Sequence, residues 1–429
     1  MSEIHKMTGF GFGPIQAGLF VHEAVRSGAF SRIVIAEIDP TLVEAVRSNN
    51  GCYRINIALR DGIASEDVQG IEILNPLVPK DRTSLLSALN ESTDVTTCLP
   101  SISAYAIGGN ASVADLLARG LAEGTAPSTI VYTAENNNHA GEHLEQQVTT
   151  AGRGTPSRSV QYLNTVIGKM SRVVTDPDEI AELRLHPITP GLKKAFLVES
   201  FSRIMVSRIR IPGVTPGIRS FDEKDDLLPF EEAKLYGHNA VHALLAYVGE
   251  LRGHKTVASI SADDAVIKIA RSAFLNESGA ALRIKFGHIG EPLFTEAGYA
   301  AYVDDLMERI TNPFLQDSIQ RAGRDVLRKL APDDRLFGAM RLALENGIEP
   351  SNMAMGTMAA IAVLMQRDEA REVPASLRRG DWRNWSDADI EVLVKWLWRD
   401  SRVPPAQRLI HCVQQAKPRL LNLLVRAEQ

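Results

Sequence analysis

Apolar residues follow two different patterns along the chain, and the change falls near residue 228. In the first half, short apolar runs rich in β-branched residues, at 32–38, 94–99 and 128–134, are typical of buried parallel strands. Segments 40–51 and 112–124, which lie between such runs, have the spacing of amphipathic helices. This alternation predicts a doubly wound α/β sheet.

The second half reads as one helix after another. Val241, Leu244, Leu245 and Val248 stand at i, i+3, i+4 and i+7, a stripe that faces a core. The same spacing recurs over residues 263–279, 296–310 and 351–366. We therefore predict α/β plus all-α architecture: an N-terminal Rossmann-type domain over 1–200, with a doubly wound sheet, and a C-terminal helical domain over 201–429.

The net charge and the composition limit the kinds of binding partner that we expect. The 429 residues carry a net charge of −5, with a pI near 6.1, so no basic field exists to hold nucleic acid or an anionic membrane. Three scattered cysteines argue against a disulfide framework. The apolar run 353–365 is too short to span a bilayer and predicts a buried helix. The amino terminus lacks the apolar stretch of a signal peptide, so we expect a cytoplasmic protein.

A glycine-rich turn opens the first predicted helix. Gly11 permits a tight turn and Gly13 allows a pyrophosphate to approach the backbone. Pro14 suits a first helical turn, and the N–H groups of that turn attract phosphate. Gln16 stands where G-x-G-x-x-G has its third glycine, so taken alone the pattern is equally that of an ordinary glycine turn. The candidate cofactor-binding residues here are Gly11, Phe12, Gly13, Pro14 and Ile15.

Glu37 ends the apolar run 32–38, at the place where the dinucleotide fingerprint has an acid for the ribose hydroxyls. A carboxylate there favours NAD and repels the 2′-phosphate of NADP. The alternative is that Glu37 merely begins a solvated loop. A methyltransferase using S-adenosylmethionine has a similar loop and acid, but it has no place for the large helical second half.

Two histidine pairs have spacings known from metal sites. His139-Ala140-Gly141-Glu142-His143 matches H-x-x-E-H, but it directly follows a predicted strand and polar turn. His238 and His242 are also four apart, with Asn239 where a metalloprotease has glutamate. We reject zinc at both places and predict a metal-independent protein.

Lys234, Asn239 and His242 form K-x4-N-x2-H at the start of the first long helix of the second half. At about 100° per residue, Asn239 lies roughly 140° from Lys234, with His242 between them. All three side chains can reach one site, where a desolvated lysine suits a general base. The alternative is a solvated lysine beside a helical asparagine and a partly buried histidine.

The segment "KLYGHNAVHALLAYVGELRGHKTV" closely resembles the catalytic helix of the polyol-specific long-chain dehydrogenases, the mannitol dehydrogenase family. The resemblance covers nearly the whole chain. It includes "GFGPIQAGLF", "YTAENNN", "LNTVIGKMSRVV" and "FLVESFSRI", while "ESGAALRIKFG" and "NPFLQDSIQRAGRDVLRKL" resemble the mannitol-1-phosphate branch most. The resemblance implies a Rossmann-type domain plus a helical domain and an NAD-dependent, metal-independent oxidoreductase of polyol metabolism.

Residue roles follow from the resemblance alone. Lys234 is implied as general base, and Asn239 and His242 as ligands of the reacting oxygen. Asn164 and Glu199 match substrate-side positions, and Glu135 and Asn136 match the stretch beside the nicotinamide. Two departures stand out, Gln16 for the third glycine and Gly168 where the family commonly has an acid.

The substrate stays open between a polyol, a polyol phosphate and a sugar acid. Arg321, Arg324 and Arg328 share one face if their segment is helical, and Lys329 lies beside them. Guanidinium groups suit phosphate or carboxylate, so we include Arg324 and Arg328 as substrate-binding candidates. The alternative is a solvated face paired with Asp317 and Asp325, and Asn164 favours neutral polyols.

The function predicted from these residues is the interconversion of a sugar alcohol and its ketose with a lysine acid/base. The alternatives are a uronate-type keto acid reductase and a catalytically weak NAD-binding sensor, the latter suggested by Gln16 and Gly168. A monomer or small homo-oligomer is expected.

Overall fold

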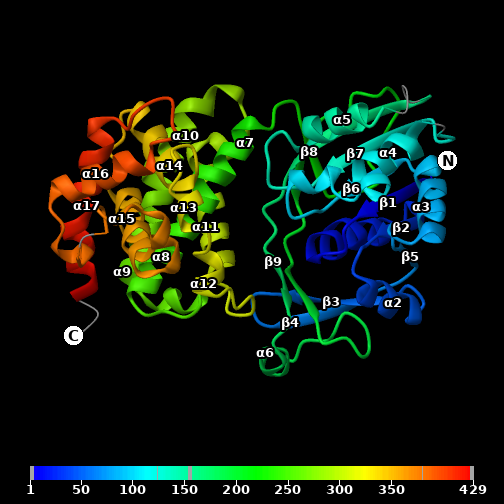
Figure 1. Cartoon of the computed structure of the whole chain (residues 1–429), viewed down its shortest axis with the longest axis horizontal. Coiled ribbons are helices and arrows are strands. Elements are labelled where there is room, and N and C mark those ends of the chain that lie inside the picture. Colours follow the sequence, from blue (N-terminus) through cyan, green and yellow to red (C-terminus); the bar gives the residue numbers. More distant parts are fainter. Residues whose placement is uncertain (1–3, 123, 153–156, 379, 426–429) are drawn as a thin grey trace. The chain divides into compact units, whose positions relative to one another are not determined.

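The computed structural model describes residues 4–122, 124–152, 157–378 and 380–425. The chain forms two compact units, Met1–Leu228 and Pro229–Gln429. The sequence placed the boundary at 200/201. The predicted fold class is confirmed, because the first unit is built on a largely parallel sheet and the second on packed helices (Figure 1).

The main sheet of the first unit has eight strands in the order β12-β11-β8-β7-β6-β1-β2-β5. All neighbours from β5 to β8 are parallel, and β11 joins β8 in the antiparallel sense. The parallel part follows the order 3-2-1-4-5-6 of dinucleotide-binding folds, which reverses between β1 and β6. The strands are β1 (His5–Phe10), β2 (Phe30–Ala36), β5 (Ile71–Leu74), β6 (Asp94–Thr97), β7 (Ser128–Thr133), β8 (Ser159–Val166), β11 (Ile204–Ser207) and β12 (Phe221–Lys224).

A second sheet in the same unit has the order β4-β3-β10-β9. Its strands are β3 (Tyr53–Ala58), β4 (Ile63–Val68), β9 (Ser171–Val174) and β10 (Ala195–Glu199). A shared core that contains Phe12, Phe20 and Tyr53 packs the first helix between the two sheets. A separate core lies on the other face of the main sheet, under α3 (Pro79–Glu91), α4 (Val113–Ala122) and α5 (Ala140–Thr150) (Figure 1). The remaining α-helices of this unit are α1 (His22–Ser27), α2 (Pro40–Ser48) and α6 (Pro177–Glu182).

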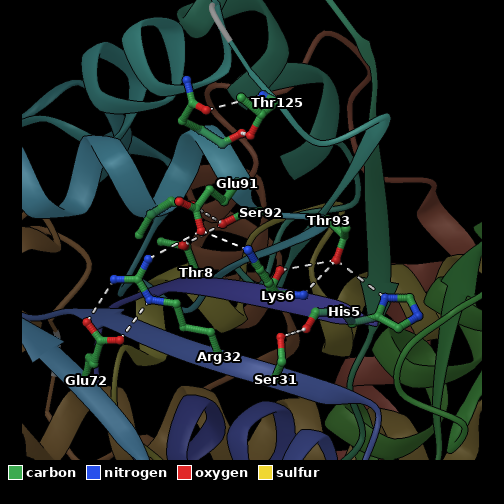
Figure 2. A network of polar contacts seen from close by, with 12 residues as sticks. His5, Lys6, Thr8, Ser31, Arg32, Glu72, Glu91, Ser92, Thr93 and Thr125 are labelled. Atoms are coloured by element: carbon green, nitrogen blue, oxygen red, sulfur yellow. Dashed lines mark hydrogen bonds and ion pairs between the residues drawn. The ribbon is translucent and has the colours of Figure 1, made fainter. Parts of the chain in front are cut away.

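A polar network fixes the amino ends of the central strands (Figure 2). The buried His5 Nδ1 lies 2.8 Å from Asp94 Oδ2, which joins the start of β1 to the start of β6. Nearby, Lys6 Nζ donates to Glu91 at 2.9 Å and Arg32 Nε to Glu72 at 2.8 Å. The glycine loop follows the carboxyl end of β1. These contacts therefore hold the strands together at their amino ends, opposite the loop.

The second unit is organised around two long helices that contact each other closely. These are α8 (Ala240–Leu251) and α15 (Ser351–Gln366), and a Cβ added at Gly356 would lie 2.7 Å from Leu244 Cγ. Residues Met353–Leu364 of α15 are all buried, which confirms that the apolar run is a core helix. No helix within the described ranges is long and apolar enough to cross a membrane.

The other α-helices among the described residues of this unit are α7 (Leu228–Glu232), α9 (Asp264–Ser272), α10 (Gly279–Phe286), α11 (Glu296–Ile310), α12 (Ile319–Ala322), α13 (Val326–Lys329), α14 (Arg335–Glu345), α16 (Asp387–Leu397) and α17 (Gln407–Val425). Within the part of the chain that the structure describes, three helices contain π-helical turns: η1 (Gln16–Val21), η4 (Ala233–Asn239) and η6 (Ala273–Ser278).

Candidate functional site

The glycine loop lies at the point where the strand order reverses. Gly11 has φ of +81°, and a Cβ there would lie 2.6 Å from the carbonyl oxygen of Cys98, the residue after β6. Nothing lies within 4 Å of a Cβ built on Gly13, so its backbone is open to a ligand. The helix begins at Pro14, and Ala17 N–H donates to Gly13 C=O at 2.9 Å. This geometry fits a pyrophosphate, which needs open backbone and a helix amino terminus.

Gln16 replaces the third glycine without separating helix and strand. Its side chain is fully buried and Nε2 donates to Thr96 Oγ1 of β6 at 2.7 Å. The amide crosses Gly9 of β1, where an added Cβ would lie 2.1 Å from Nε2. One glycine of β1 thus makes room for the side chain. Gly18 packs against Val198 of the second sheet, where an added Cβ would lie 2.6 Å from Cγ1.

Glu37 is fixed at the end of β2 by three backbone donors. Its carboxylate accepts from the N–H groups of Phe12 at 2.7 Å, Ile38 at 2.7 Å and Asp39 at 2.8 Å. The first of these bonds joins the acid to the glycine loop. Glu37 is therefore part of the loop's architecture, and the reading of a merely solvated loop acid is wrong.

Glu135 and Asn136 follow β7, and they differ in environment. Glu135 is buried and accepts from Thr97 Oγ1 at 2.8 Å, from Leu99 N–H at 2.8 Å and from the hydroxyl of Tyr105. These bonds join the ends of β6 and β7. Asn136 is exposed on the adjoining turn.

The two substrate-side candidates of the first unit lie on different sheets. Asn164, near the end of β8, donates Nδ2–H to Glu142 at 2.7 Å and accepts from Gly141 N–H at 2.8 Å. Glu199 is buried at the end of β10 and accepts from Met170 N–H at 2.5 Å. Asn164 is thus bonded to the start of α5, whereas Glu199 is bonded to the residue before β9.

The H-x-x-E-H segment is the amino-terminal turn of α5. His139 precedes the helix, and Glu142 is the residue that accepts from Asn164.

Lys169 lies beside Gly168, where this sequence departs from the pattern of the mannitol dehydrogenases. Its side chain is buried and donates Nζ–H to the carbonyls of Glu199 at 2.6 Å and Phe201 at 2.7 Å. Across the described residues, no group of three or more His, Cys, Asp and Glu side chains could hold a metal ion.

Lys234 and Asn239 lie in the π-helical turn η4, and His242 lies in the α-helix that continues it. In an α-helix, Lys234 and Asn239 would lie roughly 140° apart. A π turn bonds residues five apart, so Lys234 and Asn239 lie closer to a common face than they would in an α-helix. His242 stands three residues further on the α-helix, again on the same face. The turn thus aligns all three residues better than expected, and π turns are frequent at functional sites.

Lys234 is partly buried. Loss of hydration and the positive charge of Arg335 outweigh the attraction of Glu231 and lower the pKa of Lys234 to about 8. The helix α14, which begins at Arg335, packs directly on η4, because a Cβ added at Gly338 would lie 2.5 Å from Tyr236 Cε1. The lysine therefore releases its proton close to neutral pH, as a general base requires.

His242 has an acidic neighbour. Its Nε2 lies 3.1 Å from Oδ2 of Asp317, whose other oxygen accepts from Arg321 Nε at 2.7 Å. Burial by itself raises the pKa of Asp317, but His242 and Arg321 more than offset this and lower it to about 2. The sequence anticipated the contact between Arg321 and Asp317 and missed the one to His242.

The arginine face predicted from a continuous helix is wrong. Gly323 to Asp325 interrupt the segment, with Asp325 at φ of +57°, so that α12 and α13 are separate four-residue helices. Arg324 lies 3.8 Å from Asp325, and Arg328 lies 3.1 Å from Asp334. Both guanidinium groups are well exposed, so each has an acidic partner at the surface.

Lys329, by contrast, is buried and donates to the carbonyl of Ala322. Lost hydration, with Arg335 and Arg328 nearby, lowers the pKa of Lys329 to about 7. Its place next to the arginines is its one distinctive feature in the sequence, and that place did not predict its burial.

Comparisons with known proteins agree with this architecture. Residues 226–387 match the mannitol dehydrogenase C-terminal domain. The mannitol-1-phosphate 5-dehydrogenase of Brevibacillus brevis is 28% identical over 381 residues, covering 87% of this chain and 90% of that protein. The enzyme of the same name from Exiguobacterium sibiricum is 29% identical over 359 residues, covering 83% and 85%.

The second unit thus resembles the mannitol dehydrogenase C-terminal domain, and most of the chain resembles the two mannitol-1-phosphate 5-dehydrogenases. This confirms the resemblance to the mannitol dehydrogenase family and to its mannitol-1-phosphate branch.

Two solved structures have a similar fold. A D-sorbitol dehydrogenase in substrate-free form has a TM-score of 0.75 at 15% identity, with 99% of this chain and 95% of that chain covered. The mannitol 2-dehydrogenase of Pseudomonas fluorescens, in a ternary complex with NAD and D-mannitol, has a TM-score of 0.70 at 14% identity, with 99% and 94% covered.

Proposed function

We propose that this protein is an NAD-dependent dehydrogenase that interconverts the CH–OH group of a polyol phosphate, of the mannitol 1-phosphate kind, with the ketone of the matching ketose. The observation that carries the proposal is Lys234, a partly buried lysine with a pKa near 8 in the region that matches the mannitol dehydrogenase C-terminal domain. Both curated relatives are named for mannitol 1-phosphate, which favours a phosphorylated substrate over a neutral polyol.

Oxidation of an alcohol requires the O–H proton to leave as the hydride leaves. The neutral amine of Lys234 accepts that proton. Asn239 and His242, on the same helix face, donate hydrogen bonds to the oxygen as negative charge develops on it, where such donors stabilise the transition state most. In the reverse direction the protonated Lys234 returns the proton to the ketone oxygen.

The first unit supplies the cofactor site in this proposal. NAD bound there would supply the hydride acceptor for oxidation and, as NADH, the hydride donor for reduction. Gly11 permits the tight turn, Gly13 leaves its backbone open to the pyrophosphate, and the helix that begins at Pro14 offers its N–H groups. Glu37 accepts from the ribose hydroxyls and disfavours a 2′-phosphate. Glu135 and Asn136 stay proposals for the nicotinamide side, and Asn164 and Glu199 for the substrate. Arg324 and Arg328 are the weakest substrate candidates, because each guanidinium is exposed and has an acidic partner.

The alternative of a weak NAD-binding sensor rested on Gln16 and Gly168. Gln16 is accommodated by Gly9 and bonded to Thr96, so this departure leaves the loop intact. The second alternative, a reductase of keto sugar acids, uses the same lysine and differs only in substrate.

One screen tests the proposal. Purified protein is assayed with polyols, polyol phosphates and sugar acids, and NADH absorbance is followed in both directions. We expect turnover that is fastest with a polyol phosphate. Turnover confined to sugar acids would favour the reductase, and NAD binding without turnover on the whole panel would favour the sensor.

A further inference from the structure

Asp317 is held in place more rigidly than a surface acid. Its carbonyl accepts from Val257 N–H at 2.8 Å, and Ile319 N–H donates to Lys255 C=O at 3.0 Å, so the segment is pinned on both sides of a bridge between Thr256 and Ser318. The preceding residue, Gln316, has φ of +47°. This region is unfavourable for a non-glycine residue, and such strain persists only where surrounding structure imposes it.

The pinned carboxylate faces His242. Asp317 is 5% exposed, and its Oδ2 and the Nε2 of His242 are both buried atoms 3.1 Å apart. The histidine side chain nevertheless keeps 20% of its surface exposed, so the ring is open on a side other than Nε2. The contact angle is not yet that of a good hydrogen bond, and catalytic hydrogen bonds often tighten only when substrate binds.

We propose that Asp317 is a positioning residue that accepts a hydrogen bond from Nε2–H of His242 and so turns the opposite edge of the imidazole toward the reacting oxygen. This inference rests on the proposed function, in which His242 touches that oxygen. An acid on one ring nitrogen fixes both the tautomer and the orientation of the ring. Arg321 occupies the other carboxylate oxygen and keeps the acid ionised.

The chain contains a matched control in the same unit. Asp263 also pairs with an arginine and a histidine: Arg252 Nε lies 2.5 Å and His254 Nε2 lies 3.5 Å from its Oδ2. It is 9% exposed and caps α9 through Val266 N–H. Asp263 therefore combines the same residue types at similar burial, but its histidine is not part of K-x4-N-x2-H.

The test is a double-mutant cycle on the full-length enzyme with its best substrate from the screen. Asp317→Asn should lower kcat about 10- to 100-fold, the worth of one charge-assisted hydrogen bond, and leave KM for NAD unchanged. In a His242→Gln background the same change should cost less than about twofold, which is within the scatter of uncoupled sites, because no imidazole is left for Asp317 to orient. Asp263→Asn should lower the melting temperature comparably and leave kcat within about twofold.

A loss from Asp317→Asn that is undiminished in the His242→Gln background would overturn the proposal, as would an unchanged kcat. If Asp317→Asn does not fold, nitrogen NMR of the imidazoles in the unmodified protein decides, with His242→Gln used for assignment. We expect a proton on Nε2 of His242, and a bare Nε2 would overturn the proposal. Because this measurement needs no turnover, its outcome is separate from the failure of the proposed function.

Discussion

The glycine loop of the first unit and the lysine helix of the second are both built on a helix that contains a π turn, but they present different chemistry. Around Gly11 and Gly13 the candidate ligands are backbone N–H groups, and side chains such as Gln16 and Glu37 serve to hold the backbone. Around Lys234 the candidate groups are side chains, and the π turn serves to align them. Substitutions in the loop should therefore affect cofactor binding, and substitutions on the helix should affect the chemical step.

Lys234→Ala should have the largest effect, because it removes the proposed acid/base. We expect kcat to fall about 10²–10⁴-fold, the typical worth of a positioned proton-transfer group, with NADH affinity unchanged. Steady-state kinetics and NADH fluorescence titration measure the two quantities. Near-normal turnover would exclude Lys234 from the mechanism. The lysine helix would then have no more part in the chemical step than the glycine loop has.

The pH dependence should report the same lysine. Below its pKa of about 8 Lys234 is protonated and cannot accept a proton. The oxidation rate should therefore rise about tenfold per pH unit up to that value and level off above it. Reduction needs the protonated form and should decline above the same pH. A profile recorded in both directions checks the sign, and Lys234→Ala should abolish the ionisation.

Gly11→Ala should mainly destabilise the fold of the loop, whereas Gly13→Ala should mainly weaken the binding of NAD. At Gly11 the new Cβ meets the Cys98 carbonyl at positive φ, so the free energy of unfolding should fall by at least about 1–2 kcal/mol and NAD binding should weaken.

The new Cβ of Gly13→Ala meets no protein atom within 4 Å. It should leave stability unchanged and raise KM for NAD about tenfold or more, the worth of one lost hydrogen bond. Denaturant unfolding and NAD kinetics measure both, and unaltered NAD binding by Gly13→Ala would show that the open backbone is not the cofactor site.

Glu37→Gln should mainly change cofactor choice. The amide oxygen can still accept from the Ile38 and Asp39 N–H groups, which share one carboxylate oxygen, but the NH2 group cannot accept from Phe12 N–H. The change also removes the charge that repels a 2′-phosphate. We expect the preference for NAD over NADP in kcat/KM to fall about tenfold, as for the loss of one charged contact. Equal use of NAD and NADP by the unaltered enzyme would already contradict the role given to Glu37.

Arg328→Ala should have the smallest effect. The guanidinium is exposed and lies near Asp334 and Asp325, and exposed pairs contribute only about 0–1 kcal/mol. We expect less than about a threefold change in kcat/KM with either a phosphorylated substrate or its neutral analogue. A tenfold or greater loss restricted to the phosphorylated substrate would instead make Arg328 a phosphate ligand, as the sequence first suggested.

The sequence by itself determined the local features. The apolar period predicted the parallel strands and the helical second half, and the order of Gly11, Gly13, Pro14 and Glu37 predicted the loop and its acid. These depend on backbone preferences and burial patterns that lie within one segment. The segment around Lys234 likewise carried the family resemblance.

Only the tertiary structure decided how distant segments meet. It placed the Gln16 amide between Gly9 and Thr96, brought the Asp317 carboxylate to His242, and ended α12 at Gly323 so that the arginine face did not form. It also replaced one α turn by a π turn, which brings Asn239 closer to the face of Lys234 than an α-helix would. Each of these depends on contacts between residues far apart in the chain or on a local change of helical period, and periodicity within one segment contains neither.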